Sequence, residues 1–181
     1  ELVGDKGTAL SLINITRIYI SENTIINSSG SIFRINNCHQ VKIEHLLMSS
    51  LYGSRKMNFA FVHLLNVNII MIKHSNFIDE IDGTVFNIAD ADKIILQHSR
   101  FRYVKGTCIK VSFSGQISTK VIDIHKSIFI SCHSTIKKYG AAINIIITSF
   151  RERMLQSNLR GRNTNIGHKN LKDKQNLIKL I

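Results

Sequence analysis

The chain has 181 residues, a net charge of +12 at pH 7 and a hydrophobic fraction of 44%, so it is long enough to bury the core of a single domain. Ile occurs 31 times while Pro and Trp are absent, and because Ile is β-branched and favours strands, the composition disfavours a helical bundle. The apolar runs are far shorter than the ~20 residues of a membrane-spanning helix.

A short pattern marks the start of six repeat units along the chain. A glycine followed by alternating apolar residues recurs at residues 7–12, 30–35, 83–88, 106–111 and 140–145, and one further unit begins at Phe59 without glycine. Periods of this length are typical of repeat architectures. The units start 23 to 34 residues apart, and the longer spacings predict inserted loops over 51–58, 112–120 and 134–139.

Three strands are predicted in each unit, because apolar and polar residues alternate in three short segments, which is the pattern of half-buried strands. In the unit that begins at Gly83, these segments lie around residues 84–88, 94–96 and 99–101. The apolar residues of the second and third strands recur at fixed offsets and predict two interior ladders: Ile20, Ile43, Ile72, Leu96 and Ile124, and Ile25, Met48, Phe77, Phe101 and Phe129.

Three short strands per unit, with no helical period between them, predict an all-β fold in which each unit is one coil of a parallel β-helix. The same position in successive coils then stacks about 4.8 Å apart. A β-sandwich and a propeller are the main alternatives, but both need antiparallel hairpins that join strands in twos. We therefore predict a parallel β-helix of about five to six coils over residues 1–147 and a basic, non-repeat tail over 148–181.

The repeat resembles the right-handed parallel β-helix superfamily, whose best-known members are similar to pectate lyases. More narrowly, it is similar to polymorphic-outer-membrane-protein-type repeats, which combine a Gly-Gly-Ala-Ile motif with a Phe-x-x-Asn motif. Residues 140–143 read Gly-Ala-Ala-Ile, close to the first motif. The Phe of the second motif is matched by Phe77, Phe101 and Phe129. The position of its Asn, three residues later, is occupied by Glu80, Val104 and Cys132. The Ile-, Asn- and Lys-rich, Pro-free composition also resembles surface proteins of protists with AT-rich genomes, such as ciliates.

The resemblance implies a non-enzymatic structural or adhesive module of a secreted or cell-surface protein, whose coil faces contact a glycan or a protein. The contact surface is predicted to carry Tyr19, Arg34, Lys42, Arg100 and Lys110. The alternatives are a carbohydrate-active enzyme of the same fold, either a polysaccharide lyase or a glycoside hydrolase, and polyanion binding through the basic tail. We expect no cofactor, no specific nucleic-acid partner, and membrane attachment only through an anchor outside this sequence.

Two features bear on the compartment. The chain begins at Glu1 without Met or a signal-like segment, so we expect a fragment or a processed chain. The segments Asn14-Ile15-Thr16 and Asn27-Ser28-Ser29 match the N-glycosylation pattern at predicted corners and favour an extracellular or cell-surface location.

Three histidines recur in one register, two residues after the inner aliphatic residue of the second strand. His45, His74 and His98 should therefore stack, with His125 one position out of line. Neutral imidazole is a metal ligand and titrates near physiological pH, so one interpretation is a metal-binding or pH-sensing column. The other interpretation, which we favour, is a polar ladder at a corner, because no Cys or carboxylate recurs beside the histidines.

Acidic residues provide the only candidates for catalysis. Asp90 and Asp92 lie between the first and second strands of one coil, where paired acids can bind Ca²⁺ or act as general acid and base. Asp123 lies in the neighbouring coil, and Lys93 and Lys120 lie in these two coils. A solvated turn explains Asp90 and Asp92 more simply, since the acid pair does not recur in other coils.

The cysteines and the tail leave alternatives open. Cys38, Cys108 and Cys132 show neither a Cys-x-x-Cys spacing nor a metal pattern, and an odd count leaves at least one free thiol in a monomer. Residues 151–181 hold eight basic residues against two acidic ones, which is half of the net charge. This tail is interpreted as disordered, as a cap over the open strand edges, or as a polyanion-binding segment, with Leu171, Ile178 and Ile181 able to form one face of a short helix.

Overall fold

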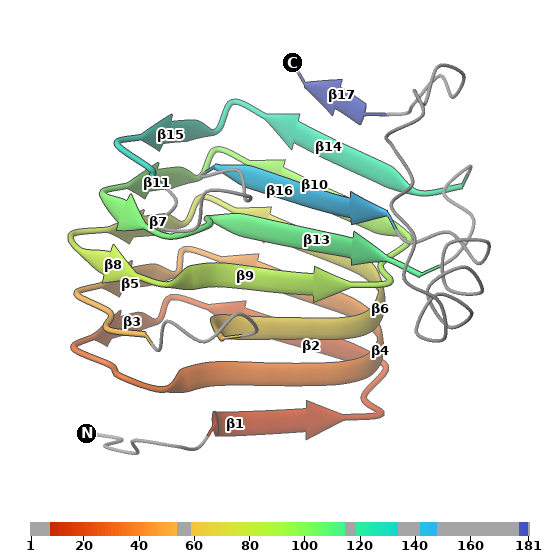
Figure 1. Cartoon of the computed structure of the whole chain (residues 1–181). Helices are drawn as coiled ribbons and strands as arrows, with labels where there is room; N and C mark the ends of the chain where they lie inside the picture. The colour runs from red at the N-terminus through yellow and green to blue at the C-terminus, as the bar shows by residue number, and fades with distance from the viewer. Residues whose placement is uncertain (1–7, 54–58, 115–118, 134–141, 148–177, 181) are drawn as a thin grey trace, which may run out of the picture.

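The computed structural model describes residues 8–53, 59–114, 119–133, 142–147 and 178–180. These residues form short strands joined by turns, and none of them lies in a helix (Figure 1). The strand pairs among them are all parallel. The predicted all-β class is confirmed for this part of the chain, and the antiparallel alternatives are not observed in it.

The pairing register matches the repeat that was predicted from the unit starts. Thr8 pairs with Ser31, Phe33 with Val62, Ala60 with Thr84, Phe86 with Ile109 and Ile109 with Ile143, which are separations of 23, 29, 24, 23 and 34 residues. Both predicted interior ladders are also formed, since Ile43 pairs with Ile72 and Phe77 with Phe101. Sequence periodicity therefore fixes which residues become neighbours across the stack.

The chain passes through three strand positions and then returns beside its starting point. We call one such passage a rung, and the rungs cover residues 8–29, 30–53, 59–82, 83–105 and 106–133, with a sixth beginning at 142. The first and second strand of each rung lie in two arms of a ten-stranded sheet, and the third strand lies in a five-stranded sheet (Figure 1). The two arms are continuous in β4 (Ser31–Glu44) and β6 (Ala60–Lys73).

All but two of the other strands fall into the same three positions. The first arm contains β1 (Thr8–Ile13), β9 (Thr84–Ala89), β13 (Ile109–Phe113) and β16 (Ile143–Ile147). The second arm contains β2 (Arg17–Ser21), β10 (Lys93–Gln97), β14 (Val121–His125) and β17 (Ile178–Leu180). The five-stranded sheet contains β3 (Thr24–Ile26), β5 (Leu47–Ser49), β7 (Asn76–Ile78), β11 (Arg100–Arg102) and β15 (Ile128–Ile130). A small parallel pair joins β8 (Ile81–Asp82) to β12 (Val104–Lys105).

The chain turns at residues with a left-handed backbone, with φ between 49° and 58°. All of them except Glu80, which follows Asp79, form three columns along the stack: Asn14, Asn37, Asn66 and Asp90; Glu22, His45, His74, His98 and Lys126; and Asn27, Ser50, Asp79, Tyr103 and Ser131. Asn, Asp and His are the side chains most often found in this conformation, which explains their recurrence at the corners. The corner amides still bond to the next rung, as His74 N–H does to the carbonyl of Gln97 at 3.0 Å, so a corner does not break the ladder.

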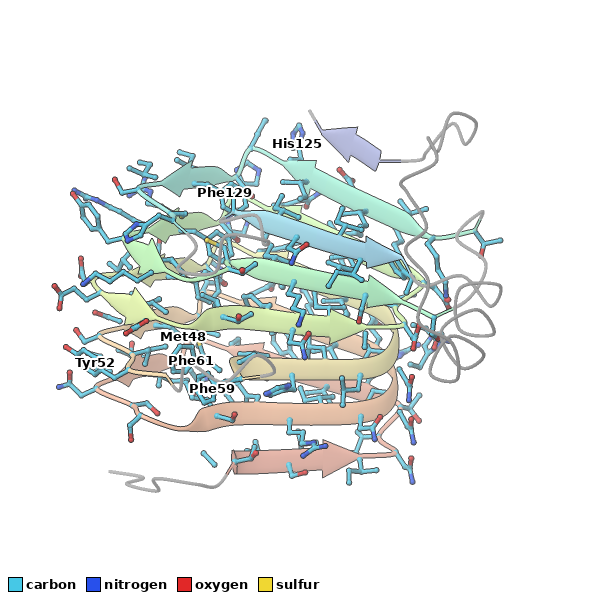
Figure 2. The ribbon with its side chains drawn as sticks, in the orientation of Figure 1. Met48, Tyr52, Phe59, Phe61, His125 and Phe129 are labelled. Carbon is cyan, nitrogen blue, oxygen red and sulfur yellow. The ribbon has the colours of Figure 1, made fainter. Side chains whose placement is uncertain are left out.

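The core is a set of inward columns that run along the stack. The inward column of the second arm contains Ile43, Ile72 and Leu96, and that of the five-stranded sheet contains Met48, Phe77 and Phe101. All six side chains are fully buried. Figure 2 shows Met48 and Phe61 inside the stack and Tyr52 projecting from its edge. A single rung cannot bury such a face alone, so the stability of each rung depends on its neighbours.

Three sequence-based boundaries need correction. The loop predicted over 51–58 begins later, because Leu51 is fully buried and Tyr52 bridges to Asp82. The loop predicted over 112–120 also begins later, since β13 continues to Phe113. In the tail, Ile178 lies in β17, which pairs with β14, and not in a helix. The predicted loop over 134–139, Leu171 and Ile181 lie outside the described residues, and the boundary at 147 stays a prediction.

Candidate functional site

The histidine column predicted from the sequence is formed at the corner after the second strand. The rings of His45 and His74 stack with centroids 5.4 Å apart and an interplanar angle of 11°, and those of His74 and His98 with centroids 4.9 Å apart at 9°. His125 contacts His98 edge-on at 6.3 Å, because Lys126 occupies the corner position in that rung. The shared left-handed backbone and the regular rung spacing together align the rings.

Electrostatics at the column favour the uncharged imidazole at His98. Desolvation lowers the pKa of His98, and the nearby positive groups at His74, Lys126, His125 and Lys73 act in the same direction. Glu22 begins the column on the side of His45 and is the single acid among the described residues of the column. Within the described residues of the column, His98 therefore lies among neighbouring bases that disfavour its protonation.

The stacked geometry does not suit a metal ion. Zinc binds imidazole nitrogen at about 2.0–2.1 Å, so two nitrogens on one ion are at most about 4.2 Å apart. Parallel rings 4.9 and 5.4 Å apart hold their in-plane lone pairs side by side and not converging on a point. In the part of the chain that the structure describes, no group of three or more His, Cys, Asp or Glu side chains could hold a metal ion. The geometry thus favours a corner ladder at His45, His74 and His98.

A column of buried serines follows the histidines and was missed by the sequence analysis. Ser75 and Ser99 are 1% exposed, and each hydroxyl donates to the carbonyl two residues earlier, at 2.8 and 3.0 Å. Each also accepts from a backbone amide of the preceding rung, as Ser99 Oγ does from Ser75 N–H at 3.3 Å. Ser127 continues the column by accepting from Ser99 N–H at 3.2 Å. The repeated His-Ser pair at 74–75 and 98–99 is the sequence signal that points to it.

The candidate catalytic acids are held in contacts between rungs. Asp90 occupies a left-handed corner, and its Oδ1 accepts from the amide and hydroxyl of Ser114 at 2.6 and 2.7 Å. Asp92 Oδ1 pairs with Lys120 Nζ at 2.5 Å. Both contacts connect the fourth rung with the fifth, so these carboxylates hold the corner between the two arms.

Asp123 stands apart from the other two acids. It lies within β14, paired in register between Ile95 and Lys179, whereas Asp90 and Asp92 lie at the corner. Lys93, the other basic residue considered, is exposed at the start of β10. The structure thus brings Asp92 and Lys120 together, but it does not place Asp123 in the same contacts. The catalytic role of the three acids stays a prediction.

A small polar cluster lies on the outside of the second arm. The Tyr19 hydroxyl donates to Glu44 Oε2 at 2.9 Å, and Lys42 Nζ lies 2.9 Å from the same oxygen and 5.0 Å from the centre of the Tyr19 ring. The hydrogen bond from Lys42 lowers the pKa of Glu44, so this carboxylate is charged at neutral pH. Tyr19 is 60% exposed, and its ring offers an apolar surface beside two charges.

The other predicted contact residues lie on different sides of the stack. Arg34 and Lys110 share one outward column of the first arm, together with His63, whereas Arg100 lies in the five-stranded sheet. Burial lowers the pKa of His63, and Arg34 adds to the effect. The five residues predicted as a contact surface therefore divide among three surfaces, and Tyr19 with Lys42 is the pair that the structure brings together.

Comparison of the chain with protein-family models, curated proteins and solved structures found no significant match. Among the described residues, no helix has the length and apolarity needed to span a membrane.

Proposed function

We propose that the chain forms a right-handed parallel β-helix of about five to six coils that acts as a non-enzymatic structural or adhesive module of a secreted or cell-surface protein. The parallel pairing, the constant order of strands in each rung and the three columns of left-handed corners support the β-helix. Exposed Asn14 and Asn27, the acceptor residues of the two glycosylation patterns, lie at corners and support the secreted location.

One observation carries the non-enzymatic part of this proposal. The polar groups that catalysis would need are bonded to the next rung: Asp90 to Ser114 and Asp92 to Lys120. A general acid or base has to reach the proton that it transfers in the substrate. Carboxylates committed to rung-to-rung contacts are better suited to fixing the stack than to chemistry, so the outward residues are assigned to contact.

The enzymatic alternative is tested with acidic polysaccharides, with and without Ca²⁺. The purified chain, Asp90→Ala and Asp90→Asn are incubated with polygalacturonate and related polymers, and the release of unsaturated or reducing ends is followed. We expect no turnover that depends on Asp90. Asp90→Asn keeps a side chain that tolerates the left-handed corner, so it separates catalysis from folding. Robust turnover that disappears in both folded variants would overturn the proposal.

Adhesion is tested at the Tyr19–Lys42–Glu44 cluster. Binding of the chain to an array of acidic and neutral glycans is compared for Tyr19→Ala and Arg100→Ala, since Arg100 lies on another surface. If the cluster is the contact surface, Tyr19→Ala weakens binding while Arg100→Ala does not. Equal loss in the two variants, or binding that neither variant alters, contradicts this placement.

A further inference from the structure

Two of the three cysteines, Cys108 and Cys132, face each other across the interior of the fifth rung. The thiol of Cys108 donates to Cys132 Sγ with the sulfur atoms 3.2 Å apart. Cys108 is fully buried at the start of the rung, whereas Cys132 is partly exposed near its end. The chain between them passes through β13, β14 and β15, so a bond between the sulfurs would close almost one full rung into a covalent ring.

In the fourth rung, valines occupy the two positions that Cys108 and Cys132 hold in the fifth rung. Cys108 is in register with Val85, since Ile109 pairs with Phe86. Cys132 is in register with Val104, because Lys105 bridges to His133. Both valines are fully buried. Apolar side chains of similar size are thus sufficient for packing here, and packing alone does not explain two thiols at facing positions of the fifth rung.

We propose that Cys108 and Cys132 form a redox-active pair, a modification site that a small disulfide such as oxidised glutathione converts into an intramolecular disulfide. Forming the bond requires the sulfur atoms to approach by about 1 Å from their contact as thiols. Cys38 is excluded from the pair, because its thiol is buried in the second rung and donates to the carbonyl of Asn36 at 3.5 Å.

The environment of the pair assigns a role to each sulfur. The hydrogen bond from Cys108, aided by hydrogen bonds to the backbone at Val104 and Ile130, lowers the pKa of Cys132 to about 7. The same contact and burial raise the pKa of Cys108. Because the thiolate is the nucleophile in exchange and Cys132 is the sulfur that solvent can reach, Cys132 attacks first.

The exchange proceeds in two balanced steps. The Cys132 thiolate attacks one sulfur of the small disulfide, forms a mixed disulfide and releases one small thiolate. Cys108 then loses its proton and attacks Cys132 Sγ, which forms the protein disulfide and releases the second small thiolate. Two electrons pass from the protein pair to the oxidant, and the two protons lost by the protein pair are taken up by the two small thiolates, which become thiols.

The test follows the fully reduced chain during incubation with oxidised glutathione near pH 7.5. We expect a product two hydrogens lighter, in which mass spectrometry of unreduced peptides joins Cys108 to Cys132 and leaves Cys38 free. Oxidation should raise the melting temperature by about 5–10 °C, because closing a rung constrains the unfolded chain. Peptides that join Cys38 to either partner, or a reduced chain that does not react, would overturn the proposal.

Valine variants that copy the fourth rung provide matched controls. Cys108→Val should stop the reaction at a stable mixed disulfide on Cys132, whereas Cys132→Val should block both the adduct and the bond. Cys38→Val, which matches its register partner Val67, should leave the reaction unchanged. Circular dichroism checks that each variant keeps its strand content, and Cys→Ser replacements serve where a valine variant does not fold. Accumulation of an adduct in the Cys132→Val variant but not in Cys108→Val would contradict the assigned roles.

Discussion

At the scale of single residues, His98 in the histidine column makes stability depend on pH. The pKa of His98 is lowered in the folded chain, mainly by desolvation and then by its positive neighbours. A histidine with a lowered pKa stabilises the fold above its ordinary pKa, and this contribution is lost as the pH falls through the folded value. We expect the chain to melt at a lower temperature at pH 5 than at pH 7.5. These two pH values lie about one unit or more on either side of the ordinary pKa of histidine.

The paired variant His74→Asn/His98→Asn isolates the contribution of the column. Asn accepts the left-handed corner, as Asn37 and Asn66 do in the first column, so the fold should persist. Its melting temperature should vary less between the two pH values. A residual dependence is expected, because burial also lowers the pKa of His63 on the first arm. A parent chain whose melting temperature is the same at both values would refute this account of the column.

Residue-scale chemistry was partly predictable from the sequence. The shared register of His45, His74 and His98 within their repeat units predicted their stacking, because register alone determines which corner residues are neighbours. The Cys108–Cys132 contact was not predicted, since it joins residues across the interior of a rung and not along a ladder. Contacts of this kind depend on how wide the rung is, which periodicity does not encode.

At the scale of elements, the phenylalanine ladder of the five-stranded sheet is the clearest energetic unit. Phe101 is fully buried and stacks on Phe77 at 4.6 Å and on Phe129 at 4.9 Å. Phe101→Ala should destabilise the chain by about 3–5 kcal/mol, because it removes a buried ring and leaves a cavity between two others. Urea denaturation measures the loss as a lower midpoint at an unchanged slope.

Phe129→Ala is the matched control for this ladder. Phe129 is half-buried, and it stacks on a described ring on one side, that of Phe101. Figure 2 places it near the end of the stack that carries β15. Its truncation should therefore cost less than that of Phe101. A loss as large as for Phe101 would mean that the ring stack does not set the stability of this sheet.

Element boundaries were harder to predict than element order. The sequence indicated separate first and second strands in every rung, yet in β4 and β6 they are continuous. The reason is that the left-handed residues Asn37 and Asn66 bend the strand while pairing continues on both sides. The segment Tyr52-Gly53 resembles a turn in composition, but tertiary pairing with Asp82 incorporates it into the stack.

At the scale of the whole molecule, the fold depends on one topological feature: each rung pairs in parallel with the next. Gly106 illustrates how strict the stacking is, because a Cβ there would lie 2.2 Å from the carbonyl oxygen of Gly83 in the rung below. Gly83 itself has a φ of +136°, which side-chain-bearing residues rarely adopt. At these two unit starts, the stacking of the rungs and the backbone conformation favour glycine.

The tail limits what the sequence could predict at this scale. Half of the net charge lies in residues 151–181, and of these the structure describes only β17. β17 extends the second arm beside β14, as Figure 1 shows. No repeat in the tail sequence predicts this pairing. The short segment Ile178–Leu180 carries too few residues for a periodic pattern, so only the tertiary pairing identifies it as a strand.

The most direct measurement is the pattern of nuclear Overhauser effects between backbone protons of neighbouring rungs. The account predicts amide-to-Hα contacts that link Lys42 with Met71 and Met71 with Ile95, in the order of the parallel register. Strong Hα–Hα contacts across these pairs, which are the signature of antiparallel strands, or contacts that shift the register by one residue, would contradict it.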